Sequence, residues 1–394
     1  METTLAAMVK VEYPHDTWVL DEGDDPEVKA LCARIGVNPF SRKGIERYNQ
    51  KSGSFTAKTK GGNQNAWRDS HEWRYDFVAQ MDVDHVPHPD YLHRTLGYFR
   101  DPEVGFVLGP QIYGNQHESW IARGSAEQAF GFFGVMQRGY NGAGMALLIG
   151  TNHVYRVTAM RDIGGYASSI VEDHLTGMHF FVNGWRGIYI PEVLSVGEGP
   201  VNWTDYLNQQ LRWSYGLFEI IYKHSWRLIP KMPLKQAVHY VFAQSYYFTG
   251  LTAMLSVGLL WLYFFLGISP VEGMRLGDWF EHAFPVFLLT SLILYWSQRF
   301  NVNPETESGL DWRGFLLKMG AIPIYFIALI MATLRPPLTY AVTAKGAAAR
   351  AGQGVVVRPF LAHYVILAIT LEAMLIGLSL GRSAWHLYAW AMFI

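Results

Sequence analysis

Apolar and polar residues follow one pattern in the first 220 residues and another in the rest of the chain. Residues 1–220 alternate short apolar runs with polar turns, the pattern of a soluble α/β domain. Beyond them lie long, almost wholly apolar stretches, and a helix that crosses a bilayer needs about 20 such residues. We therefore predict a soluble domain over 1–220 and a membrane region over 221–394. The predicted spans lie at about 239–267, 283–300 and 360–380, with a partial span at 384–394.

The apolar run 319–334 needs a separate interpretation. It is only about 16 residues long, contains Pro323 and has basic residues at both ends. These features favour an interfacial or re-entrant helix over a true span, which is the alternative.

The charges next to the spans predict their orientation. Four basic residues precede the first span, whereas the loop 268–282 carries three acidic residues against Arg275. The positive-inside rule then places the soluble domain and the region 299–359 in the cytoplasm. The expected location is the plasma (inner) membrane.

The soluble part reads as strands that alternate with helices. Residues 17–20, 77–81 and 104–108 are the predicted strands, and Asp25-Pro26 opens a helix with a capping aspartate followed by proline. This alternation predicts a mostly parallel sheet, whose ligands bind at the carboxyl ends of the strands. An acidic group falls directly after two of these strands, at Asp21-Glu22 and at Asp82-Val83-Asp84.

The acidic pair Asp82 and Asp84 is the candidate metal site. Two carboxylates placed two residues apart after a buried strand can share a divalent cation, and hard oxygen ligands suit Mg²⁺ or Mn²⁺. His85 and His88 are nearby candidate ligands, although histidines at this spacing are more often surface loop residues. Acidic pairs are also common in turns, so the alternative is an ordinary loop.

Three further segments carry candidate chemistry. The lysine- and glycine-containing segment 58–65 allows close approach to a phosphate, or is a solvated loop. Asp173, at the start of a predicted helix over 174–182, is either a helix cap or a general base. Arg212 suits a diphosphate and Trp213 offers a flat face to a sugar. The alternative for Gln209–Trp213 is an interfacial helix with its Arg and Trp at the headgroups.

Composition narrows the class of protein. The formal net charge is −1, so no basic field points to nucleic acid as a partner. The single cysteine, Cys32, cannot form an internal disulfide and is expected to be a small buried residue.

Taken together and in order, these motifs resemble the processive family 2 glycosyltransferases, specifically cellulose synthase catalytic subunits. The motifs are Asp21-Glu22-Gly23, Lys60-Gly61-Gly62-Asn63-Gln64-Asn65, Asp82-Val83-Asp84-His85, Gly150-Thr151-Asn152, Glu172-Asp173, Gln209-x-x-Arg212-Trp213 and, within a gating-type loop over 335–358, Tyr340-x-Val342-Thr343-x-Lys345. The resemblance implies a nucleotide-sugar-binding mixed α/β sheet of the GT-A type, followed by membrane-spanning helices.

The resemblance also implies roles for these residues. Asp173 would be the catalytic base and Asp84 the ligand of Mg²⁺ or Mn²⁺. The substrate-binding residues would be Asp21, Lys60, Asp82, Glu172, Gln209, Arg212, Trp213, Thr343 and Lys345. The implied reaction is an inverting transfer from a UDP-sugar, with UDP-glucose favoured, to a growing β-linked glycan that passes through the bilayer. Accessory secretion proteins would be further partners.

Two departures from the family pattern set further expectations. Val171 stands where the family usually has Thr or a similar residue before Glu-Asp. The first strand of the nucleotide-binding sheet is expected to be missing, as in a fragment or a mis-started reading frame. An open sheet edge and a half-formed nucleotide pocket would follow. The alternative functions are transfer of one sugar to a lipid carrier, and a non-catalytic subunit that binds glycan or nucleotide sugar.

Overall fold

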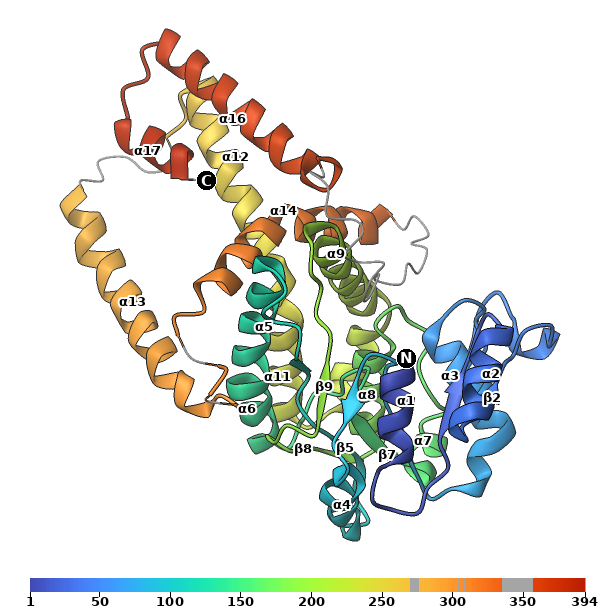
Figure 1. Ribbon diagram of the computed structural model, residues 1–394. Coiled ribbons are helices and arrows are strands. Elements are labelled where there is room, and N and C mark those ends of the chain that lie inside the picture. Colours follow the sequence, from blue (N-terminus) through green and yellow to red (C-terminus); the bar gives the residue numbers. More distant parts are fainter. Residues whose placement is uncertain (270–275, 304, 308, 335–356, 394) are drawn as a thin grey trace.

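The computed structural model describes residues 1–269, 276–303, 305–307, 309–334 and 357–393. An α/β domain built mainly from the first 230 residues forms one end of the molecule, and long helices extend from it (Figure 1). The predicted strands at 17–20, 77–81 and 104–108 are confirmed as β1 (Trp18–Leu20), β3 (Phe77–Gln80) and β5 (Val104–Leu108).

The central sheet has four strands in the order β3-β7-β5-β8, with β7 at His153–Arg156 and β8 at Arg186–Tyr189. β7 runs antiparallel to both of its neighbours, and only β5 and β8 are parallel. The prediction of a mostly parallel sheet is therefore wrong, whereas the mixed sheet is confirmed. The physical reason is the return path: the chain leaves β5 at Leu108 and re-enters opposite the same residue, at His153.

A separate parallel pair joins β1 to β2 (Asn38–Phe40) through helix α2 (Pro26–Ile35). The Asp25 side chain caps α2 by accepting a hydrogen bond from the Glu27 amide at 2.8 Å, as predicted. A third, small sheet pairs β4 (Val86–Pro87), β9 (Ser195–Gly197) and β6 (Ile112–Tyr113). Helix α1 (Glu2–Val9) lies against β4 and α2.

The hydrophobic core of the α/β domain extends past residue 220. Phe106 and Leu108 of β5 share one buried cluster with Met178 and Phe180 of α8 (Glu172–Val182). The same cluster takes in Leu228, Met232 and Tyr240, of which the last lies on α11 (Leu234–Ser245). The first helices after residue 220 are thus packed onto the domain and hold its inner face next to the apolar region.

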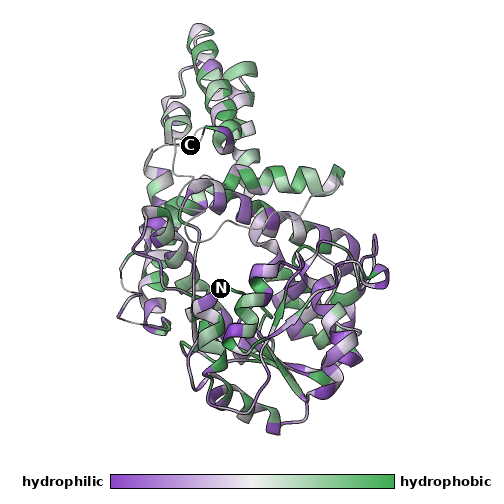
Figure 2. Ribbon diagram, turned by 45° about the vertical axis from the view of Figure 1, so that its right-hand side comes forward, coloured by the Kyte–Doolittle hydropathy of each residue, from purple (hydrophilic) through white to green (hydrophobic). Residues whose placement is uncertain are grey.

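Three helices in the described parts of the chain are long and apolar enough to cross a membrane. They are Leu234–Leu266, Trp312–Leu334 and Arg358–Ser379. The first and third cover the predicted spans at 239–267 and 360–380. The predicted span at 283–300 forms helix α13 (Leu276–Ser297), and the partial span forms α17 (Trp385–Phe393). In Figure 2 the hydrophobic residues concentrate in the helices that extend from the domain.

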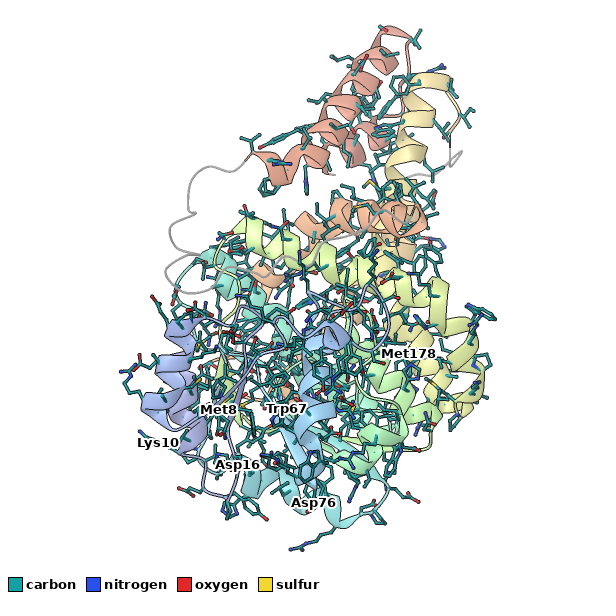
Figure 3. The ribbon with its side chains drawn as sticks, turned by 90° about the vertical axis from the view of Figure 1, so that its right-hand side faces the viewer. Met8, Lys10, Asp16, Trp67, Asp76 and Met178 are labelled. Carbon is teal, nitrogen blue, oxygen red and sulfur yellow. The ribbon has the colours of Figure 1, made fainter. Side chains whose placement is uncertain are left out.

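Helix α14 (Trp312–Leu334) contains the run 319–334 and is longer than that run, because it already begins at Trp312. It lies across the end of the domain at a steep angle to α12 (Thr249–Leu266), as Figures 1 and 3 show. Its Tyr325 is fully buried and donates a hydrogen bond to Gln210 of α9 (Trp203–Ile220) at 2.9 Å. By length and composition α14 qualifies as a span, so its interfacial position stays a prediction, which this packing against the domain supports.

Candidate active site

One large cavity of about 2150 Å³ lies beyond the carboxyl end of β3 and below α9. Its walls include most of the residues that the sequence singled out, although they are far apart in the chain. The lining contains Lys60, Asp82, Asp84, Glu172, Asp173, Gln209, Arg212 and Trp213. The fold therefore brings eight of the eleven predicted site residues to one space.

Lys60 is the cation at the centre of the acidic part of this cavity. It is the first residue of α3 (Lys60–His71), whose N-terminus is capped by Thr59 accepting from the Gly62 amide. Its ammonium group donates to Asp82 Oδ1 and to the Gly150 carbonyl, both at 2.6 Å, and lies 3.8 Å from Glu172 Oε1. Lys60 thus joins the loop after β3 to the start of α8.

A buried arginine that the sequence did not reveal holds the cap of α3 in place. Arg42 is fully buried, and its guanidinium forms a bidentate pair with Glu22 at 2.8 Å. It also donates to the carbonyls of Tyr48, Thr56 and Thr59. The loop is tight: a Cβ at Gly62 would lie 2.1 Å from the Thr56 carbonyl oxygen, so only glycine fits there. Arg42 thereby sets the position of Lys60, and no signal short of the fold marks it, since isolated arginines are common in loops.

We expect Arg42→Met to destabilise the chain by about 2–4 kcal/mol, because it leaves three loop carbonyls without their buried donor. Thermal unfolding of the detergent-solubilised protein measures the change. Arg47→Met is the matched control: Arg47 is a neighbouring, largely exposed arginine, and its loss should cost less than about 1 kcal/mol. Equal effects of the two substitutions would contradict the role of Arg42.

The candidate metal site is the group formed by Asp82, Asp84 and His85. One ligand atom from each of these residues lies within 4.8 Å of the others. The Asp82 backbone amide donates to the Thr151 hydroxyl at 2.9 Å, which fixes the loop at the end of β3. His85 is 2 % exposed, and neither ring nitrogen has a hydrogen-bond partner. Two carboxylates with an unpartnered buried imidazole fit a divalent cation such as Mn²⁺. The sequence alone had favoured a surface position for His85, which the structure contradicts, because β4 and β9 enclose its ring.

Glu172 and Asp173 begin α8 and face the cavity beside Gly150. A Cβ at Gly150 would lie 3.2 Å from Asp173 Oδ2 and 3.4 Å from Lys60 Nζ, so the loop passes very close to both. Burial raises the pKa of Glu172 to about 8, against the opposing effect of Lys60. Burial also raises the pKa of Asp173, although the His174 amide donates to its carboxylate at 2.8 Å. Asp173 is thus held within the first turn of a helix and is also a base of raised proton affinity.

The raised pKa of Glu172 predicts how stability depends on pH. The folded chain holds a proton on this group between the unfolded pKa, about 4.3, and the folded value of about 8. In that window the folded state binds more protons than the unfolded state, so stability falls as pH rises. We expect Glu172→Gln to lessen this fall, so that between pH 5 and 8 the wild type loses roughly 2–3 kcal/mol more than the variant. Parallel unfolding curves of the two proteins over this range would contradict the assignment.

The segment Gln209–Trp213 lies on α9, above the acidic residues. Gln209, Arg212 and Trp213 line the cavity, and the Trp213 ring is 37 % exposed. Gln210 instead turns away and accepts from Tyr325 of α14. A fixed guanidinium and a partly exposed indole at the roof of an acidic cavity favour a diphosphate and sugar site over the interfacial anchor.

Three predicted site residues are not placed in the cavity lining. The Asp21 carboxylate accepts hydrogen bonds from the amides of Gly23 and Asp25, at 2.9 and 2.5 Å, and so forms the turn after β1. Its contact with a nucleotide stays a prediction. Thr343 and Lys345, with most of the predicted gating loop 335–358, lie outside the described residues.

A mixed-sheet α/β domain with an acidic site at a strand end, followed by long apolar helices, defines a GT-A-like protein. The chain belongs to the glycosyl transferase family group 2, whose model matches residues 77–299. It is 32 % identical over 219 residues to a UDP-forming cellulose synthase from Dictyostelium discoideum, in its catalytic chain. That match covers 54 % of this chain and 20 % of the Dictyostelium protein.

Other relatives agree with this family. The chain is 25 % identical over 235 residues to glucomannan 4-beta-mannosyltransferase 7 of Arabidopsis thaliana, covering 58 % of this chain and 42 % of that protein. It thus spans less than half the length of these curated relatives. Among solved structures, the mannosyltransferase PcManGT of Pyrobaculum calidifontis, in complex with GDP-Man and Mn²⁺, superposes with a TM-score of 0.50 at 14 % identity. That match covers 85 % of this chain and 84 % of that one, and it supports the fold.

Proposed function

We propose that this protein is a membrane-bound inverting glycosyltransferase that polymerises a β-linked polysaccharide, cellulose or a similar β-glucan, from a UDP-sugar. The observation that carries the proposal is one cavity that holds both the acidic groups and the Arg212–Trp213 pair. The relatives also include a UDP-forming cellulose synthase. A site that only bound sugar would not need a buried carboxylate of raised pKa next to a lysine.

In the proposed reaction each residue has a separate task. Asp173 takes the proton from an acceptor hydroxyl, whose oxygen then attacks the anomeric carbon of the donor sugar. The bond from that carbon to the nucleoside diphosphate breaks, and the configuration inverts. Lys60 and Arg212 face the leaving diphosphate and neutralise the charge that develops on it. Trp213 stacks on the terminal sugar of the acceptor, and Gln209 and Glu172 hold the reacting groups in place.

Asp84, with Asp82 and His85, would hold the divalent cation, Mg²⁺ or Mn²⁺. When bound, the cation supplies positive charge to the donor diphosphate. The relation of PcManGT to Mn²⁺ concerns that protein; for this chain the proposal depends on the donor set of two carboxylates and a buried imidazole.

The membrane helices would give the product its exit. We propose that residues 1–220 form the cytoplasmic catalytic domain and that 221–394 form the interfacial and transmembrane region, with 335–358 as its gating loop. The site supports this arrangement, because α9 at its roof is packed on α14 and thereby on the apolar helices. The growing glycan would leave past Trp213 into the bilayer region.

The test is incorporation of label from a panel of nucleotide sugars by membranes that contain the protein, followed by linkage analysis of the product. We expect an insoluble β-linked polymer, formed from UDP-glucose and absent with Asp173→Asn. A lipid carrying one sugar would replace the proposal with single-sugar transfer. Binding of nucleotide sugar with no product from any donor would replace it with a non-catalytic binding role.

A further inference from the structure

Two unpaired strand edges line the same space beside the active site. β1 pairs only with β2, and β3 is the end strand of the four-stranded sheet. In the described part of the chain, no strand pairs with the second edge of either one. The cavity is lined there by residues 16–20 on one side and 76–81 on the other. We call this part of the cavity the strand slot.

The two strands run in the same direction along helix α3. At their amino ends, the Trp18 ring lies 4.5 Å from the His71 ring, and its Nε1 donates to the Tyr75 hydroxyl, two residues before β3. At their carboxyl ends, Asn63 donates to the Leu20 carbonyl and Lys60 pairs with Asp82. In Figure 3, Asp16 and Asp76, which precede β1 and β3, lie toward the same end of the domain.

The backbone groups along the slot follow from the register. Thr17 and Asp21 use their backbone groups toward β2, so by alternation those of Trp18 and Leu20 point to the slot. Asp76 accepts from Val157 on the β7 side, and the Asp82 amide donates to Thr151 on that side. By the same alternation, the backbone groups of Phe77, Ala79 and Met81 point to the slot. Two parallel rows of backbone donors and acceptors thus border one space.

The slot is covered above and below by helices of the same chain. Trp67 of α3 lies beneath it, in contact with Trp18 and in the cluster that contains Leu20 and Val78. Leu5 and Met8 of α1 lie on the other face, in the cluster with Val19. All three helix residues line the cavity, and Figure 3 labels Met8 and Trp67. A slot with two covered faces admits a single extended chain but not the surface of a folded protein.

Three buried side chains on the slot face of α3 have polar atoms without partners. They are Asn63 Oδ1, both amide atoms of Gln64 and Trp67 Nε1. The three residues are between 5 and 9 % exposed, and all line the cavity. Each unpaired buried polar group costs about 1–3 kcal/mol. An occupant with backbone amides and carbonyls would supply the missing partners.

We propose that the strand slot binds an extended segment of a partner polypeptide as a β-strand between β1 and β3, parallel to both. Such a strand would be covered on both faces, so the segment should be a nearly continuous apolar run. Its carboxyl end would lie between Asp21 and Asp82, next to Lys60. Only this last consequence, that the segment borders the donor site, rests on the proposed function.

Hydrogen exchange of the full-length protein in nanodiscs tests the slot. The probe is a synthetic peptide, acetyl-Lys-Val-Thr-Val-Val-Val-Lys amide, and the control is the same peptide with its alternate amides N-methylated. We expect the peptide to slow exchange about tenfold or more in segments 17–21 and 77–82. β2 and β8 are the internal control, since each is a sheet edge that faces no second edge in the described chain. Equal slowing at β2 and β8, slowing by the N-methylated peptide, or no slowing at all would overturn the proposal.

A substitution in the slot gives a second, independent readout. Gln64→Leu removes two unpaired polar atoms, so it should raise the unfolding temperature of the peptide-free protein while lowering protection by the peptide. If Gln64→Leu instead destabilises the peptide-free protein, then Gln64 is satisfied without a strand and the proposal fails. Protection of segments 17–21 and 77–82 by self-association at high protein concentration, in the absence of peptide, would assign the slot to a second copy and also overturn it. Exchange is read without turnover, so these outcomes are separate from the fate of the proposed enzyme activity.

Discussion

Replacing Asp173 with asparagine should lower the rate of glycosyl transfer about 10³-fold, within the range that general base catalysis contributes. The amide keeps the size of the side chain and still accepts from the His174 amide, but it cannot take a proton from the acceptor. The measurement is the initial rate of polymer formation in membranes at saturating donor. Binding of the nucleotide sugar, followed by calorimetry, should change little, because the loss falls on the chemical step.

The stability of this variant separates catalysis from folding. Burial raises the pKa of Asp173, so its ionised form is disfavoured in the folded chain, and asparagine should unfold at the same temperature or higher near pH 7. Asp90→Asn is the matched control, an exposed carboxylate that does not line the cavity, and it should retain full activity. A residual rate above one tenth of wild type would mean that another group, with Glu172 the nearest candidate, accepts the proton.

Replacing Asp84 with asparagine should lower the transfer rate by on the order of 10²-fold and weaken Mn²⁺ binding at least tenfold. The reason is geometric: Asp84 shares one small space with Asp82 and His85, and an amide oxygen is a poorer ligand than a carboxylate. Titration of Mn²⁺ followed by electron paramagnetic resonance measures binding without turnover.

Two comparisons test the metal site further. A chelator should abolish activity of the wild type, and added Mn²⁺ or Mg²⁺ should restore it, whereas Asp84→Asn should need far more cation. His85→Ala should weaken Mn²⁺ binding if its unpartnered imidazole is a ligand, and Asp90→Asn should leave binding unchanged. Mn²⁺ affinity that is the same in Asp84→Asn and in wild type would move the site away from this loop.

The local elements could be predicted from the sequence because their causes are local. Asp25-Pro26 fixed the start of α2, and short apolar runs marked β1, β3 and β5. The direction of the strands was less accessible. The antiparallel β7 depends on the path that the chain takes between Leu108 and His153, and that path is a property of packing. The length of α14 was missed for a related reason, since its first turns are polar in sequence and become helical against α5 (Trp120–Gly131).

By itself, the sequence determined which residue types carry the chemistry. Carboxylates, one lysine and an Arg-Trp pair recur in a recognisable order, and their chemical properties do not depend on the fold. Only the tertiary structure decided which of them meet: Lys60 joins Asp82 and Glu172, Asp21 closes its own turn, and Arg42 supports the loop from behind. The strand slot also appears only in three dimensions, because an unpaired strand edge is defined by what lies beside it in space.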